Sequence, residues 1–175
     1  MENILYAIPD LCTGCNRCVY ACSAVKTGSF FPSRSRIHIN NFSYNGYSVP
    51  SICFQCPKPD CLQACPEHAI YKDESGIVRV AHQKCNGCGD CVTACPYGMI
   101  DQDDDGLAFK CDYCGGDPAC VKECEPGAIA FKPEESQMRK LRALQMKQRI
   151  SMETAAEKSR QLGRNLMEMA SHPHG

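Results

Sequence analysis

Cysteine dominates the reactive side chains of this chain, because sixteen of the 175 residues are cysteine. They fall into four sets, each of which begins with a C-x2-C pair and ends with a C-x3-C pair. The sets are Cys12, Cys15, Cys18 and Cys22; Cys53, Cys56, Cys61 and Cys65; Cys85, Cys88, Cys91 and Cys95; and Cys111, Cys114, Cys120 and Cys124. Thiolates are soft, anionic ligands, so such clusters indicate either metal coordination or a disulfide framework.

The spacing favours iron–sulfur clusters over the other two possibilities. The first and third sets have the C-x2-C-x2-C-x3-C spacing of bacterial ferredoxins, in which four thiolates hold each 4Fe-4S cluster. Zinc sites usually combine two separated C-x2-C pairs, whereas here a third cysteine follows at once. Disulfide scaffolds are short, secreted and introduced by an apolar signal segment, unlike the opening MENILYAIPD. We therefore expect four 4Fe-4S clusters, with a zinc-built interaction module as the alternative.

The composition agrees with a core built around cofactors. Tryptophan is absent, aromatic residues make up 7% and the mean hydropathy is −0.35, so apolar burial alone would be thin. Metal binding and folding should then be coupled. A net charge of −1 excludes a general attraction to nucleic acid. No apolar run reaches the ~18 residues that a membrane span needs, so we expect a soluble, cytoplasmic protein.

Each cysteine set lies in a repeated frame of a short strand, a loop through three cysteines and a helical turn with the fourth. The frames span about residues 4–22, 53–72, 77–101 and 107–132, within a four-cluster domain over residues 1–132. Short hairpins are predicted for 69–72 with 76–80 and for 99–101 with 107–110. The insertion 23–52 predicts a further hairpin that covers the clusters. The fold class is α+β, a pseudo-twofold polyferredoxin of two two-cluster modules with a long C-terminal α-helix.

Residues 133–175 form a C-terminal extension of different composition. Residues 134–172 contain no cysteine, no proline and one glycine, which favours a long helix over about 134–169. An apolar stripe at three- and four-residue steps follows one face of this helix. The helix could pack on its own domain, but its length favours docking on a neighbouring subunit, where it could link repeated copies.

The cysteine pattern predicts an electron carrier with no catalytic residues. In two-cluster ferredoxins the fourth cysteine of a motif binds the cluster of the other motif. Cys91 and Cys95 lie one helical turn apart, about 6 Å, which would bring two cluster centres to on the order of 10 Å. When cysteine and sulfide fill every iron position, no site remains for a substrate. Arg17, Lys84 and Lys110 lie near ligands, where they either raise a cluster's potential or are merely solvated.

Four segments carry a resemblance to a known family: CTGCNRCVYAC, CFQCPKPDCLQACPEHAI, KCNGCGDCVTACPYGMI and FKCDYCGGDPACVKECEPGAI. Over about residues 4–132 the chain resembles the electron-transfer subunits that accompany molybdenum and tungsten oxidoreductases. That family includes subunits of dimethyl sulfoxide reductase, formate dehydrogenase, formate hydrogenlyase and bacterial tungsten aldehyde oxidoreductases.

The resemblance implies that the first motif pairs with the fourth and the second with the third. The four clusters would then be held by Cys12, Cys15, Cys18 and Cys124 (cluster a); Cys111, Cys114, Cys120 and Cys22 (cluster b); Cys53, Cys56, Cys61 and Cys95 (cluster c); and Cys85, Cys88, Cys91 and Cys65 (cluster d). The sequence by itself equally allows the first motif to pair with the second and the third with the fourth.

The small size and the long C-terminal helix most resemble the iron–sulfur subunit of a tungsten aldehyde oxidoreductase complex. The resemblance implies a molybdenum or tungsten catalytic subunit that oxidises aldehydes, and a flavin subunit that passes electrons to NAD, or a ferredoxin, as the second partner. The same role in a formate or dimethyl sulfoxide enzyme is an alternative, as is a free-standing polyferredoxin.

Overall fold

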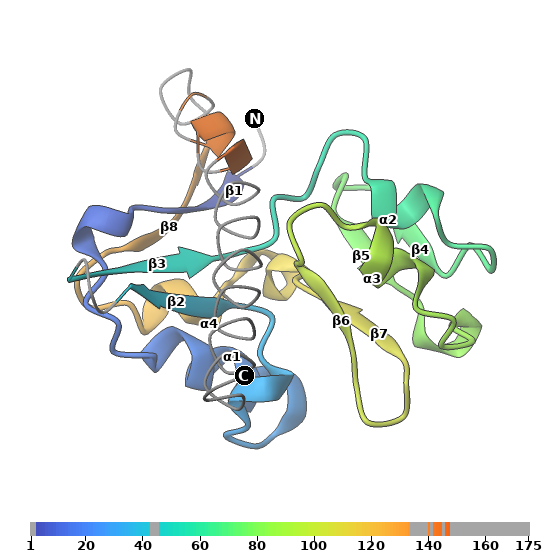
Figure 1. Ribbon diagram of the computed structural model, residues 1–175, viewed down its shortest axis with the longest axis horizontal. Helices are drawn as coiled ribbons and strands as arrows, with labels where there is room; N and C mark the ends of the chain where they lie inside the picture. The colour runs from blue at the N-terminus through green and yellow to red at the C-terminus, as the bar shows by residue number, and fades with distance from the viewer. Residues whose placement is uncertain (1–2, 43–45, 134–139, 141, 145, 148–175) are drawn as a thin grey trace, which may run out of the picture.

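The computed structural model describes residues 3–42, 46–133, 140, 142–144 and 146–147 (Figure 1). Within these ranges short helices alternate with two-stranded antiparallel sheets, which confirms the expected α+β class. The elements are β1 (Asn3–Ala7), α1 (Arg17–Thr27), β2 (His38–Phe42), β3 (Tyr47–Ser51), α2 (Asp60–Gln63), β4 (Ile70–Lys72), β5 (Val78–Val80), α3 (Asp90–Ala94), β6 (Ile100–Gln102), β7 (Ala108–Lys110), α4 (Ala119–Lys122) and β8 (Ile129–Pro133).

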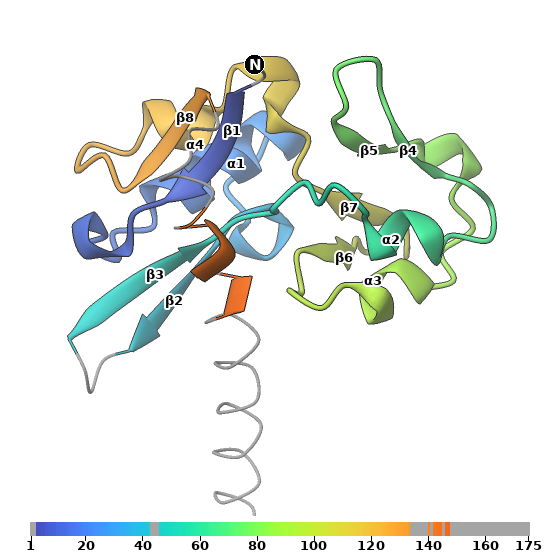
Figure 2. The same cartoon turned by 90° about the horizontal axis from the view of Figure 1, so that it is seen from above.

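The elements form two lobes, which lie side by side in both views (Figures 1 and 2). The first lobe contains β1, β8, β2, β3 and the packed helices α1 and α4; the second contains β4 to β7 and the packed helices α2 and α3. Each lobe has its own buried core, and cysteines belong to both cores. The first lobe is therefore built from the first and fourth motifs, and the second lobe from the two between them.

The first lobe is closed by the two ends of the cysteine-bearing domain. Strand β1 pairs with β8 in antiparallel register from Asn3 opposite Pro133 to Ala7 opposite Ile129. Leu5, Ala7 and Ile129 are buried at this ribbon. The pairing brings the fourth motif beside the first, across more than one hundred residues of sequence.

The two hairpins of the second lobe confirm the sequence prediction to within one or two residues at each end. Ile70 pairs with Val80 in one, and Ile100 with Lys110 in the other. Both turns use the same device, an aspartate that accepts two backbone N–H groups. Asp73 Oδ1 accepts from Ser75 and Ile77 at 3.0 and 2.9 Å, and Asp103 Oδ1 accepts from the equivalent positions at 3.1 and 2.8 Å. The matching turns are a further sign of the internal repeat.

Helix α1 is longer than α2, α3 and α4, because proline follows the last cysteine within two residues in the second, third and fourth motifs but not in the first. It runs for eleven residues from Arg17 to Thr27, whereas α2, α3 and α4 have four or five. Ser23 takes the position after Cys22 and is fully buried. Its Oγ donates to Ser29 O at 2.6 Å and accepts from the Phe31 N–H at 2.8 Å, which holds the following loop against the helix.

The insertion forms the extra hairpin that the sequence predicts. Strands β2 and β3 pair from His38 opposite Ser51 to Phe42 opposite Tyr47. The hairpin lies against the first cysteine loop, because a Cβ placed on Gly14 would come within 2.6 Å of Ser48 Oγ. The insertion therefore covers this loop, and the wider expectation that it covers the clusters stays a prediction.

The described part of the C-terminal extension is helical and touches its own domain. Arg142 is buried, 9% exposed, and donates from Nη2 to the Gln55 carbonyl at 3.4 Å. Most of the predicted helix over 134–169 lies outside the described residues, so docking on a neighbour stays a prediction. In the part of the chain that the structure describes, no helix has the length and apolar character needed to cross a bilayer.

Candidate metal centres

The structure gathers the sixteen cysteines into four groups, each with three cysteines of one motif and one of another. We call them set a (Cys12, Cys15, Cys18, Cys124), set b (Cys111, Cys114, Cys120, Cys22), set c (Cys53, Cys56, Cys61, Cys95) and set d (Cys85, Cys88, Cys91, Cys65). Sets a, c and d each wall a hollow. In set b, Cys120 lies near Cys22, Cys114 and Cys111 in the core of the first lobe.

Each of the helices α1 to α4, together with the residues just after it, carries cysteines of two different sets. Helix α1 holds Cys18 of set a and, four residues on, Cys22 of set b. Helix α4 begins one residue before Cys120 of set b, and Cys124 of set a follows its last turn. In the second lobe α2 and α3 connect sets c and d in the same way. A helical turn fixes the spacing within each pair of sets, because cysteines four residues apart lie about 6 Å apart along the axis.

The cysteine loops curl through left-handed backbone positions. In the third motif Gly87 and Gly89 have φ of +75° and +82°, and a Cβ on Gly87 would lie 3.0 Å from the Gly106 carbonyl oxygen. Only glycine adopts such φ values without steric cost. This tight curl brings Cys85, Cys88 and Cys91 around one hollow.

We expect Gly87→Ala to weaken set d more than a matched glycine change weakens set b. Both Gly87 and Gly115 have positive φ, so alanine at either costs about 1–2 kcal/mol of backbone strain. Only at Gly87 does the new methyl also press on a backbone oxygen, since nothing lies within 4 Å of the Gly115 position. The visible absorbance of anoxic Gly87→Ala protein should bleach several-fold faster on heating than that of Gly115→Ala. Equal bleaching rates would contradict the contact.

Burial makes the bare thiols reluctant to ionise. It raises the pKa of Cys18 and of Cys120 to about 12, with neighbouring thiolates adding to the effect. Burial also raises the pKa of Cys61 to about 11, which Lys110 partly opposes. Four thiolates can share such a site when a cationic centre compensates their negative charge. Binding of a metal centre displaces the thiol protons and supplies that positive charge. The donor set thus fits a metal centre with four thiolate ligands, such as a 4Fe-4S cluster.

Backbone N–H groups also point at cysteine sulfur atoms. Arg36 N donates to Cys22 Sγ and Ala69 N to Cys65 Sγ, both at 3.3 Å. Met99 N donates to Cys95 Sγ at 3.4 Å, and Ala108 N to Cys85 Sγ at 3.5 Å. Hydrogen bonds to ligand sulfur stabilise its negative charge and tune a bound cluster.

Thiols of two motifs line each of three hollows. Throughout the described ranges, no three His, Cys, Asp or Glu side chains are arranged to hold a single metal ion.

The three cations that the sequence places near cysteines differ in environment. Arg17 is half exposed and pairs with Glu123 and Glu125 at 3.3 and 2.5 Å. Lys84 is exposed. Lys110 is buried, with 7% of its surface exposed. Of these three, Lys110 is therefore the one whose charge is sheltered from water.

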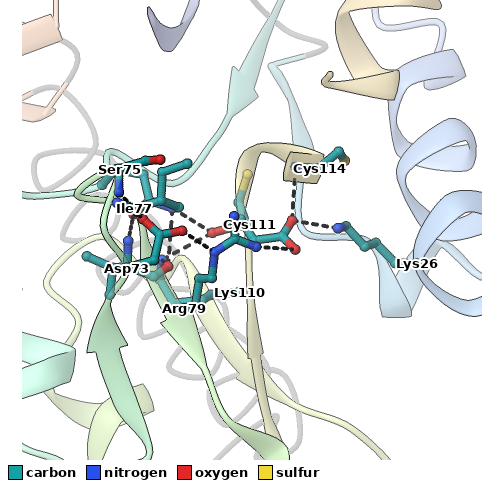
Figure 3. A network of polar contacts seen from close by, with 11 residues as sticks. Lys26, Asp73, Ser75, Ile77, Arg79, Lys110, Cys111 and Cys114 are labelled. Atoms are coloured by element: carbon teal, nitrogen blue, oxygen red, sulfur yellow. Dashed lines mark hydrogen bonds and ion pairs between the residues drawn. The ribbon is translucent and has the colours of Figure 1, made fainter. Parts of the chain in front are cut away.

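A polar network that sequence reasoning missed connects the lobes. Lys26 of α1 pairs with Asp112 at 2.5 Å, and Asp112 lies 3.8 Å from Arg79 of the second lobe, which pairs with Asp73 at 2.5 Å (Figure 3). Burial alone would raise the pKa of Asp112. The hydrogen bond and the charge of Lys26 outweigh that effect and lower the pKa below its ordinary value, so Asp112 stays ionised at neutral pH. No sequence signal pairs residues so far apart along the chain.

Comparison with known families and proteins supports this site description. The 4Fe-4S dicluster domain matches residues 44–134, more than half of the chain, and a 4Fe-4S binding domain matches residues 9–27. The polyferredoxin-like subunit of an aliphatic sulfonate oxidoreductase from Pyrococcus furiosus is 42% identical over 127 residues, 71% of this chain and 73% of that protein.

Two further relatives have similar identity. The thiosulfate reductase electron transfer subunit of Salmonella typhi is 33% identical over 144 residues, 74% of this chain and 75% of that protein. The beta subunit of an NADH-dependent phenylglyoxylate dehydrogenase from Aromatoleum evansii is 39% identical over 129 residues, which cover 69% of this chain but 28% of that longer subunit. Such names agree with the expectation of a non-catalytic subunit. On the matched domains and these relatives, the chain belongs to the family of 4Fe-4S dicluster domain proteins.

Proposed function

We propose that this chain is an electron-transfer subunit of an oxidoreductase complex and holds one 4Fe-4S cluster at each of sets a, b, c and d. The observation that carries the proposal is the gathering of sixteen cysteines into four groups of four, three of which wall a hollow. Bound clusters of this type supply one-electron transfer. The cysteines hold them, and the backbone N–H groups that face sulfur stabilise the thiolate charge.

The sets follow one another in the order a, b, c, d. Sets a and b share α1 and α4, and sets c and d share α2 and α3. Sets b and c meet across the lobes, where the thiols of Cys111 and Cys53 interact. Cys15 and Cys88 are exposed, and they belong to the two terminal sets. This order supports a linear electron-transfer chain in which each terminal set, a or d, offers an exposed docking end (a port) to a partner.

We infer that a molybdenum or tungsten catalytic subunit docks at one port and a flavin and NAD-binding subunit or a ferredoxin at the other. Aldehyde oxidation is the first candidate for the catalytic subunit, on the resemblance of the motifs and the C-terminal extension. Oxidation of an aliphatic sulfonate is the second, favoured by the relative from Pyrococcus furiosus, whose name gives that activity.

Anoxic co-purification tests the proposal and separates these substrates. Tagged full-length chain should be brown, contain about sixteen irons and as much acid-labile sulfide, four per cluster, and retain a partner that contains tungsten or molybdenum. Adding an aldehyde to the complex should bleach the visible absorbance if the first candidate is correct, and adding an alkanesulfonate if the second is. A colourless protein with bound zinc would overturn the proposal.

The C-terminal extension is proposed to dock on a neighbouring subunit through the helix over 134–169. Deletion of residues 134–175 should leave the iron content at about sixteen per chain and abolish co-purification of partners. Arg142→Gln in the full chain is the matched control, because it removes the hydrogen bond to Gln55 while leaving the extension in place, and it should retain the partners. Partner retention by the deleted chain would rule out the docking role.

A further inference from the structure

Lys110 lies at the junction of the two lobes, between set b and set c. It ends β7 and directly precedes Cys111 of set b, while its side chain lines the hollow of set c. Its Nζ donates to the Val78 carbonyl at 2.8 Å and to the Cys111 carbonyl at 3.1 Å (Figure 3). The ammonium group is thus fixed beside cysteines of both sets.

Gln55 secures the same junction from the side of set c. It lies in the loop between Cys53 and Cys56, at a φ of +46° that is unusual for a residue other than glycine. Its Nε2 donates to the Cys111 carbonyl at 2.7 Å, and its Oε1 accepts from the Val78 N–H at 2.8 Å. Gln55 and Lys110 therefore hold the same two backbone segments.

The charge of Lys110 is not neutralised by a neighbouring acid. Among the ion pairs of the described residues, none involves Lys110, whereas Arg17 beside set a has two glutamates and Lys26 has Asp112. Carbonyl oxygens orient the ammonium group but carry only partial charge. A full positive charge in a sheltered site interacts more strongly with nearby charges than one at the surface does.

We propose that Lys110 raises the reduction potentials of the clusters at sets b and c above those at sets a and d. This inference rests on the proposed function. An added electron makes a cluster more negative, and a fixed positive charge beside it stabilises that reduced form. Set a has only the paired, half-exposed Arg17, and set d has only the exposed Lys84 among the cations named above. The clusters at sets b and c are consequently reduced before those at sets a and d.

The test is a potentiometric titration of the anoxic, full-length holoprotein, with dithionite as reductant and paramagnetic resonance as readout. Lys110→Gln removes the charge but retains an amide donor for one carbonyl. The midpoint potentials of the two clusters at sets b and c should fall. At a fixed potential, the ratio of reduced to oxidised cluster should drop about tenfold, which corresponds to about 59 mV for a one-electron couple. The other two midpoints should not move. Lys110→Arg should restore the wild-type values.

A matched lysine distinguishes a local charge effect from a change of net charge. Lys122 lies on α4 between Cys120 and Cys124, is 61% exposed and pairs with Asp117. Lys122→Gln should leave all four midpoints unchanged. Unchanged midpoints in Lys110→Gln at full iron content, or equal shifts of all four, would overturn the inference without affecting the proposed function, which fails only if no clusters are present.

If Lys110→Gln loses iron, a cysteine variant that keeps Lys110 still tests the proposed order of potentials. Cys88→Ala should remove the cluster at set d and with it one of the two low-potential signals. Loss of a high-potential signal instead would contradict the proposed order.

Discussion

The double variant Cys22→Ala/Cys114→Ala is expected to lose one 4Fe-4S cluster, the same as either single variant. Both residues belong to set b, although Cys22 lies on α1 and Cys114 in the fourth motif. Removal of one ligand already causes loss of the cluster. Removal of a second ligand of the same set therefore causes no further loss of iron, and the effects of the two substitutions are not additive. Iron should fall from about sixteen to about twelve per chain in all three proteins.

The contrasting pair is Cys22→Ala/Cys56→Ala, which should lose two clusters and about eight irons. Cys56 belongs to set c, so its loss is independent of set b. If the first motif paired with the second, the outcome would be reversed: Cys22 and Cys56 would share one cluster, and Cys22 and Cys114 would affect two. Iron analysis, with the integrated resonance of the reduced protein, distinguishes the pairings without a crystal.

Removal of iron is expected to unfold both lobes. Cysteines form a large part of the buried cores, since Cys18, Cys22 and Cys120 contribute to the first and Cys61, Cys65 and Cys91 to the second. Without a cationic centre, four sulfur atoms around a hollow leave either buried charge or empty space, and both destabilise the fold. The short helices cannot compensate, because helices of four or five residues are not stable alone.

The measurement is a heteronuclear NMR spectrum and far-ultraviolet circular dichroism before and after anoxic oxidation and chelation. Dispersed amide signals should collapse to the narrow range of an unfolded chain, and refolding should require iron, sulfide and a thiol reductant together. An apoprotein that kept its dispersed spectrum would show that apolar packing alone supports the lobes.

Local patterns were predictable where a few neighbouring residues decide the structure. The hairpins of the second lobe follow from β-prone runs around Asp and Gly turns, and Asp73 and Asp103 each close their turn with their own side chain. The insertion hairpin followed from the length of the gap between motifs. The short helices end where they do because proline follows Cys65 and Cys95 directly.

Contacts between distant segments were not predictable in the same way. The pairing of β1 with β8 depends on strands that are separated by most of the domain, and either partner alone resembles any short strand. Gln55 is one polar residue among many in the sequence, and its role depends on where Cys111 and Val78 lie in space. The position of Arg142 against Gln55 likewise needed the folded chain.

The way β1 and β8 close the first lobe has a consequence for biosynthesis. The second lobe is one continuous stretch of sequence between β3 and Tyr113, whereas the first needs both Asn3–Ala7 and Ile129–Pro133. A ribosome therefore releases every segment of the second lobe while the first still lacks half of its ligands. The internal motifs should therefore be able to bind their clusters before the terminal motifs can close the first lobe.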